Sequence, residues 1–135
     1  MKYYIASGLP NAARVSLAAQ ALGAHERTYD WTAHGDIRAE GPARMNSVSS
    51  CELAAVAEAE LVLLLLPGGK GTHTELGAAL ATRANKRVVL WSEMGEEFRA
   101  GGGETHPSVC AFYFHPAAER WVCPFNELLV RLRAL

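Results

Sequence analysis

The stretch LLLLPGGKGTHTELGAAL, residues 63–80, places a carboxylate, Glu75, shortly after a glycine-rich turn that follows a run of leucines. The glycines of the turn, among them Gly69 and Gly71, let the backbone approach a ligand closely. A helix that begins near Thr72 would direct free N–H groups and the positive end of its dipole at that ligand. The pattern predicts a cradle for a phosphate group or a sugar hydroxyl. A tight strand–helix turn without a ligand explains the glycines equally well.

Glu75 itself has two interpretations. It follows Thr72 by three residues, the spacing of a capping box in which the two side chains bond to the first turn of a helix. Alternatively it is a catalytic carboxylate at a helix N-terminus, where the dipole would keep it ionised. The spacing alone favours the capping box.

The composition limits what surrounds these residues. The chain has 135 residues, of which half are hydrophobic and a fifth charged, so a single domain, 1–135, with a substantial core is expected. A formal net charge of −1 gives no electrostatic footprint for nucleic acid or for a membrane surface. The longest apolar run, 61–66, is too short to span a bilayer, and the first residues lack a secretion signal. The three cysteines form no zinc-binding pattern, no cluster has metal-ligand spacing, and a cytoplasmic protein with reduced thiols is expected.

Hydrophobic patterns predict the elements that position Glu75. The expected strands are Lys2–Ala6, Glu26–Asp30, Leu61–Leu66, Arg87–Trp91 and Val109–Phe114. The expected helices are Ala12–Leu22, Ala43–Ala59, Thr72–Arg83 and Phe125–Leu135, with a possible break at Asn46–Ser50 in the second. Trp31–Pro42 is expected to be a loop, and Glu93–Ser108 a mobile one. This alternation predicts an α/β fold, a Rossmann-like parallel sheet of about five strands with helices on both faces. Ligands of such sheets bind beyond the carboxyl ends of the strands.

Several short segments of the sequence resemble those of known enzymes. Residues 67–75 match PGGxGTxxE, a motif similar to that of the Lonely Guy-type phosphoribohydrolases, which remove the base from a nucleoside 5′-monophosphate. A wider set, YYIASGLPN, TYDWTAHG, the region 52–80 and CAFYFHP, resembles the nucleoside 2-deoxyribosyltransferase family. The likeness is to its short bacterial members and their nucleotide N-hydrolase relatives.

The resemblance implies roles for two carboxylates. Glu75 matches the glutamate that acts beneath C1′ of the sugar, where it stabilises or bonds to the positive carbon that forms as the base departs. Glu52 stands where the family has an aspartate that holds sugar hydroxyls or helps the leaving base. A solvated position on a helix face explains Glu52 equally well, and Asp30 is a rival for the acid role.

The resemblance also implies a substrate site. Ser7, Gly8 and Asn11 match the ligand contacts of the first loop. Trp31 or Tyr29 is placed to stack on the base, and packing in the core is the alternative for either ring. Together with Asp30, the turn residues Gly69, Gly71 and Thr72 complete the expected substrate contacts.

The first loop lacks the arginine-rich sequence of the hydrolases, so Arg14 and Lys70 are the candidates for binding a phosphate. The family needs no cofactor or metal, and it forms homodimers or larger homo-oligomers. A neighbouring subunit completes each site, a part that Tyr113 or His115 would take.

The sequence therefore predicts cleavage of the N-glycosidic bond of a (deoxy)nucleoside or its 5′-monophosphate, with transfer of the sugar to another base or to water. The small-molecule partner is a nucleoside or nucleotide. The alternative is a module that binds or senses a nucleotide without turning it over.

Overall fold

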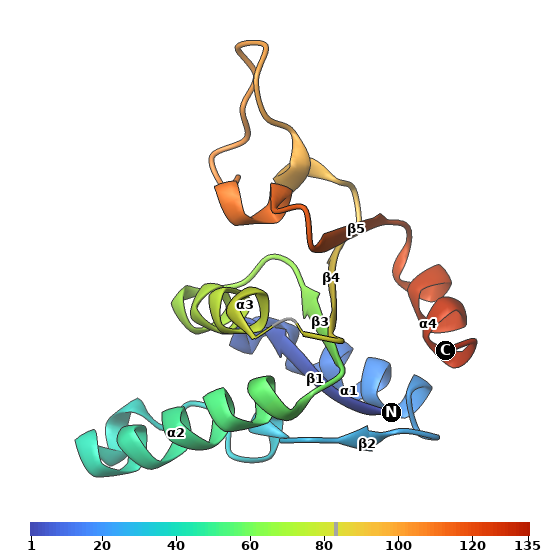
Figure 1. Cartoon of the computed structure of the whole chain (residues 1–135). Helices are drawn as coiled ribbons and strands as arrows, with labels where there is room; N and C mark the ends of the chain where they lie inside the picture. The colour runs from blue at the N-terminus through green and yellow to red at the C-terminus, as the bar shows by residue number, and fades with distance from the viewer. Residues whose placement is uncertain (83) are drawn as a thin grey trace.

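The computed structural model, which describes residues 1–82 and 84–135, contains a five-stranded sheet in the order β2-β1-β3-β4-β5. The strands are β1 (Lys2–Ser7), β2 (Glu26–Arg27), β3 (Leu61–Leu65), β4 (Arg87–Ser92) and β5 (Ala118–Val122). Every neighbouring pair is parallel, as Figure 1 shows. The expected α/β, Rossmann-like architecture is confirmed.

Four helices cover the two faces of this sheet. They are α1 (Ala12–Ala21), α2 (Pro42–Glu58), α3 (Lys70–Ala81) and α4 (Phe125–Arg133). Helix α1 packs against α4, and α2 packs against α3, so each face carries one pair of helices (Figure 1). None of the helices in the described part of the chain is both long enough and apolar enough to cross a membrane.

The strand β3 lies at the centre of the core. All five of its side chains are buried, because it has a strand on each side and a helix layer on each face. This explains why its sequence is a continuous apolar run and not an alternating one. A strand buried in this way gives the turn that follows it a fixed starting point.

The strand order creates a crevice at one edge of the sheet. Strand β1 lies beside β3, with Ser7 opposite Leu65 at their carboxyl ends. The chain then leaves β1 toward α1 on one face and leaves β3 toward α3 on the other. Ligands of open parallel sheets bind where the connections diverge in this way, and the glycine turn lies at this point.

The last strand was predicted in the wrong place. Residues 109–114 do not form a strand, because Ala111–Phe114 is a 3₁₀ helix, η5, and the fifth strand is Ala118–Val122. Aromatic residues favour strands in general. Here only Tyr113 packs into the core, whereas Phe112 and Phe114 are exposed. The true strand, AERWV, is at the edge of the sheet and pairs on one side only, so its polar side chains stay at the surface.

Smaller corrections concern the helices and loops. Helix α2 runs through Asn46–Ser50 without a break, because Ser49 and Ser50 both bond back to the Asn46 carbonyl inside the helix. Strand β2 ends at Arg27, so Asp30 lies beyond it. The last residue of the predicted helix Thr72–Arg83 lies outside the described residues.

The expected loop after Trp31 contains two 3₁₀ helices, η2 (Trp31–Ala33) and η3 (Arg38–Glu40). Another, η1 (Leu9–Asn11), leads from β1 into α1.

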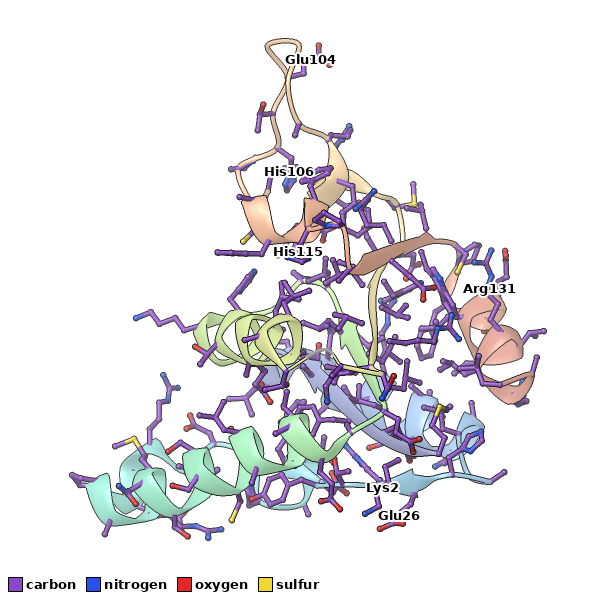
Figure 2. The ribbon with its side chains drawn as sticks, viewed as in Figure 1. Lys2, Glu26, Glu104, His106, His115 and Arg131 are labelled. Carbon is purple, nitrogen blue, oxygen red and sulfur yellow. The ribbon has the colours of Figure 1, made fainter. Side chains whose placement is uncertain are left out.

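Residues 93–117 rise from the end of β4 as a projecting segment (Figure 1). Figure 2 shows Glu104 and His106 on this projection, away from the sheet. Its base is anchored by η4 (Glu96–Phe98), where the buried Glu97 carboxylate accepts a hydrogen bond from Ser92 Oγ. The mobility expected for Glu93–Ser108 stays a prediction.

Candidate active site

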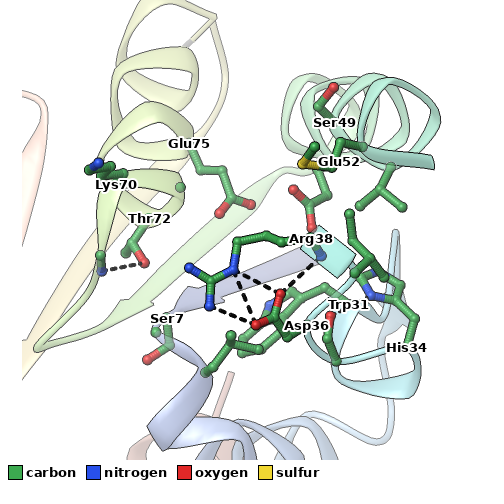
Figure 3. Close-up of a pocket in the computed structure, with 18 residues that line it drawn as sticks. Ser7, Trp31, His34, Asp36, Arg38, Ser49, Glu52, Lys70, Thr72 and Glu75 are labelled. Atoms are coloured by element: carbon green, nitrogen blue, oxygen red, sulfur yellow. Dashed lines mark hydrogen bonds and ion pairs between the residues drawn. The ribbon is translucent and has the colours of Figure 1, made fainter. Parts of the chain in front are cut away.

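A cavity of about 660 Å³ opens at the carboxyl edge of β1 and β3 (Figure 3). Its wall is formed by the first residues of α3, the inner side of α2, the end of β1 and the segment from Trp31 to Arg38. A volume of this size is typical of small-molecule sites. The site therefore lies where the fold class predicts one.

The glycine turn forms one wall of this cavity. Helix α3 begins at Lys70, two residues earlier than predicted, with Gly69 as its N-cap. The Gly69 N–H donates to Thr72 Oγ1 at 3.2 Å, so Thr72 caps the helix without Glu75. A Cβ at Gly68 would lie 2.6 Å from Thr72 Cβ, whereas a Cβ at Gly69 or Gly71 would meet open space. Gly68 is thus required by packing, and the other two glycines leave room above the helix N-terminus.

Glu75 lies at the bottom of the cavity. It is the sixth residue of α3 and is only 7% exposed. Its Oε2 atom and the Tyr4 hydroxyl are both buried, and neither makes a hydrogen bond of standard geometry among the described residues, although the two groups lie close enough for the hydroxyl to act on the carboxyl group. Burial raises the pKa of Glu75 to about 8; the Tyr4 hydroxyl lowers it somewhat and the Glu52 carboxylate raises it further.

The prediction that the helix N-terminus keeps Glu75 ionised is therefore wrong. The dipole acts within the first turn of a helix, and Glu75 lies beyond that turn. Loss of water around the carboxyl group dominates its pKa instead.

Glu52 faces the same cavity from α2. Figure 3 shows the Glu52 and Glu75 carboxyl groups projecting into the pocket from two helices. Glu52 is half-buried, and this burial raises its pKa, while the His34 ring lowers it. Two carboxyl groups that face one cavity with raised pKa values are chemically suited to proton transfer and to stabilising positive charge.

The first loop contributes through Ser7 and Gly8, which line the cavity, while Asn11 does not. Ser7 Oγ donates to the Leu65 carbonyl at 2.7 Å. Asn11 Nδ2 donates to Ser7 Oγ at 3.0 Å and to the Pro67 carbonyl at 3.3 Å. Asn11 therefore ties the first loop to the glycine turn and stands behind the cavity wall.

Trp31 lines the cavity and Asp30 does not. The Trp31 indole Nε1 donates to the Ile5 carbonyl at 2.8 Å, which fixes the orientation of the ring. Asp30 accepts from the Thr32 N–H at 3.0 Å and pairs with Arg27 at 2.9 Å. Asp30 thus caps η2, and its place in the structure gives no support to the rival acid role.

The two cations predicted for phosphate binding lie in different places. Lys70 lines the cavity. Arg14 pairs with Glu93 at 2.9 Å and lies over the rings of Trp91 and Phe125, outside the cavity lining.

His34, Asp36 and Arg38 were not predicted as site residues, and they line the cavity from the segment expected to be a plain loop. The only signal in the sequence was an acidic residue, Asp36, two positions before a basic residue, Arg38, in the segment that follows a predicted strand.

Tyr113 is engaged within its own chain. It is 2% exposed, and its hydroxyl lies 2.6 Å from His73 Nε2. His73 Nδ1 lies 2.6 Å from the Gly69 carbonyl, which can only accept. Nδ1 is therefore assigned the proton, and Nε2 accepts from Tyr113. This bond links the projecting segment to the glycine turn, and Tyr113 is not available to a neighbouring subunit.

Within residues 1–82 and 84–135, no group of three or more His, Cys, Asp or Glu side chains is arranged to hold a metal ion.

Comparison with known proteins shows a likeness in structure but not in sequence. No family model matches the chain, and no curated protein matches its sequence. Among solved structures, the CMP N-glycosidase BcmB of Clostridium botulinum matches with a TM-score of 0.63 and 15% sequence identity, covering 98% of each chain. At this identity the likeness shows that the two chains share a fold along their whole length.

Proposed function

We propose that this chain cleaves the N-glycosidic bond of a nucleoside or a nucleoside 5′-monophosphate, with Glu75 acting at C1′ of the sugar. The observation that carries the proposal is the Glu75 carboxyl group, which is buried at the bottom of the cavity with one oxygen free of any partner in the described chain. The shared fold with a protein described as a CMP N-glycosidase supports it, as does the resemblance of residues 67–75 to the motif of base-removing enzymes.

The residues present suit a two-step reaction. Ionised Glu75 would bond to C1′ as the bond from C1′ to the base breaks, and the electron pair of that bond stays on the base nitrogen. Glu52, which faces the same cavity, would supply the proton that the departing base takes up. Water or a second base would then attack C1′, the bond from C1′ to Glu75 would break with its electron pair returning to the carboxylate, and Glu52 would take up the proton that the attacking molecule loses. The outcome is hydrolysis with water and transfer with a base.

Trp31, Ser7 and Gly8 would hold the substrate above the two acids. The indole ring of Trp31 is 6% exposed and packs mainly in the core, so it would contact the substrate only through the small part that lines the cavity. The room above Gly69 and Gly71 lets a sugar or phosphate approach the free N–H groups of α3.

Chromatography of free base tests the proposal. Ribo- and deoxynucleosides and their 5′-monophosphates, CMP first, are incubated with wild type and Glu75→Gln, with and without a second base. We expect base release by the wild type only. Dependence on the second base would identify a transferase, and release in water alone a hydrolase. Equal release by both proteins, or release by neither, contradicts the proposal.

A second candidate function is a nucleotide-binding module without turnover. The specific observation in its favour is the pKa of about 8, which leaves only about a tenth of the Glu75 groups ionised at pH 7. Tight nucleotide binding without base release from pH 6 to 9 would establish this alternative. The homodimer expected from the resemblance stays a prediction, and the mass of the protein in solution would test it.

A further inference from the structure

The cavity contains a guanidinium group that the proposed reaction does not use. Arg38 lines the cavity, and its side chain is 79% exposed. Arg38 Nε lies 3.0 Å from Asp36 Oδ1, and Arg38 Nη2 lies 2.7 Å from Asp36 Oδ2, so two N–H groups hold one carboxylate. Asp36 is its only ionic partner in the described chain. A guanidinium that grips a carboxylate in this way presents the same pair of donors to a phosphate.

Arg38 and Lys70 are the two side chains of the cavity lining with a permanent positive charge, among the residues that the structure describes. Figure 3 shows Arg38 extending across the cavity, with its guanidinium on the side of Ser7 and Thr72. Lys70 opens α3, so it lies at the end of the helix where free N–H groups can also bind an anion. A nucleoside 5′-monophosphate with its C1′ near Glu75 would direct its phosphate toward the two cations.

We propose that Arg38 determines specificity for phosphorylated substrates: its guanidinium, which Asp36 holds in the structure, exchanges that carboxylate for the 5′-phosphate of a nucleoside 5′-monophosphate. The inference rests on the proposed function, because it takes the same cavity and one of its two substrate classes. Asp36 is then a competitor of the substrate, and it also repels the phosphate once Arg38 has moved.

The exchange predicts that two substitutions change the affinity for 5′-monophosphates in opposite directions. Arg38→Gln removes a charged phosphate contact and is expected to weaken binding of 5′-monophosphates by about tenfold to a hundredfold. Asp36→Asn removes the competitor and is expected to strengthen it severalfold. A pair with only a structural role would show no such opposition. Both side chains are exposed, so neither change endangers the fold.

Calorimetric titration provides the test, in a Glu75→Gln background that blocks turnover. AMP, GMP, CMP and UMP are each paired with their nucleoside, which differs only by the phosphate. The matched control is Arg44→Gln, since Arg44 pairs with Glu40 at 3.6 Å on the same part of the chain but does not line the cavity. We expect Arg38→Gln to weaken only the monophosphates, Asp36→Asn to strengthen only them, and the control to change neither. Equal effects on nucleoside and monophosphate, or weaker binding after Asp36→Asn, overturn the inference.

Base release measured in parallel separates this inference from the proposed function. If Arg38→Gln alone leaves the ratio of kcat/KM for monophosphate and nucleoside unchanged while base is released, the specificity role is wrong and the proposed function stands. If monophosphates bind with the expected dependence on Arg38 and Asp36 but no base is released, the phosphate site stands and the proposed catalysis is wrong. Absence of binding by every compound overturns both.

Discussion

A Glu75→Gln variant is expected to be more stable than the wild type at neutral pH, although it lacks the proposed catalytic carboxylate. Burial raises the pKa of Glu75 from 4.5 to about 8, so the folded chain keeps a proton that the unfolded chain releases. Between these two values the folded state binds more protons than the unfolded state. The free energy of unfolding of the wild type therefore falls as the pH rises through this range.

The size of the effect follows from the difference between the two pKa values. A difference of about 3.5 units corresponds to about 5 kcal/mol once the pH is well above 8. The same relation gives about 3 kcal/mol at pH 7 and about 1 kcal/mol at pH 5, since the folded site remains mostly protonated there. Glutamine has nearly the same shape and no ionisable proton, so the free energy of unfolding of the variant does not fall with pH in this way.

Urea unfolding at pH 5, 6, 7 and 8 measures the effect, with Glu104→Gln as a control because Glu104 is an exposed glutamate on the projecting segment. The gap in unfolding free energy between Glu75→Gln and the wild type is expected to widen from about 1 kcal/mol at pH 5 to about 3 kcal/mol at pH 7. The control should follow the wild type at every pH. Parallel curves for the wild type and Glu75→Gln would refute the reasoning, because they would show that burial does not perturb this carboxyl group.

Two further predictions concern the glycine turn. Gly68→Ala is expected to lower the free energy of unfolding by about 1–3 kcal/mol, because the new methyl group collides with the Thr72 side chain. Gly71→Ala should leave stability nearly unchanged, because its methyl group meets open space. Equal losses of stability for the two variants in urea unfolding would contradict this account. Tyr113→Phe removes the hydroxyl that donates to His73 and is expected to lower stability by about 1 kcal/mol. Base release by the Tyr113→Phe variant should also fall if this bond positions the turn, and full activity would show that the contact serves folding alone.

The sheet was predictable because its signals are local. The run Leu61–Leu65 is apolar on both faces, and only a central strand of a parallel sheet places both faces in the core. The edge strand Ala118–Val122 lacks such a signal, because one of its sides pairs with nothing. Its residues are largely polar, and Glu119 among them pairs with Arg87 at 2.8 Å. The more apolar, aromatic segment 109–114 therefore gave the stronger strand signal.

The site was predictable only in part, because two of its walls depend on distant contacts. The glycine turn and Glu75 are contiguous in the chain, so a motif could place them together. Arg14 and Arg38 both follow a strand of the sheet, and the sequence offered no reason to prefer one as a cation of the site. Packing decides the matter, since Arg14 is held over Trp91 and Phe125 while Arg38 remains at the cavity.

The burial of Glu75 is consistent with the proposed reaction and not with a capping role. A capping role would have left its carboxylate bonded to backbone N–H groups at the start of α3, but Thr72 takes that position. The chain instead places the carboxyl group beside the Tyr4 hydroxyl, where each has a buried oxygen without a partner in the described structure. Such groups lower stability and are rare in folded proteins. A developing positive charge at C1′ would stabilise the ionised form of Glu75 in just this surrounding, where little water competes. The same burial that weakens the fold thus strengthens the interaction that the proposed reaction requires.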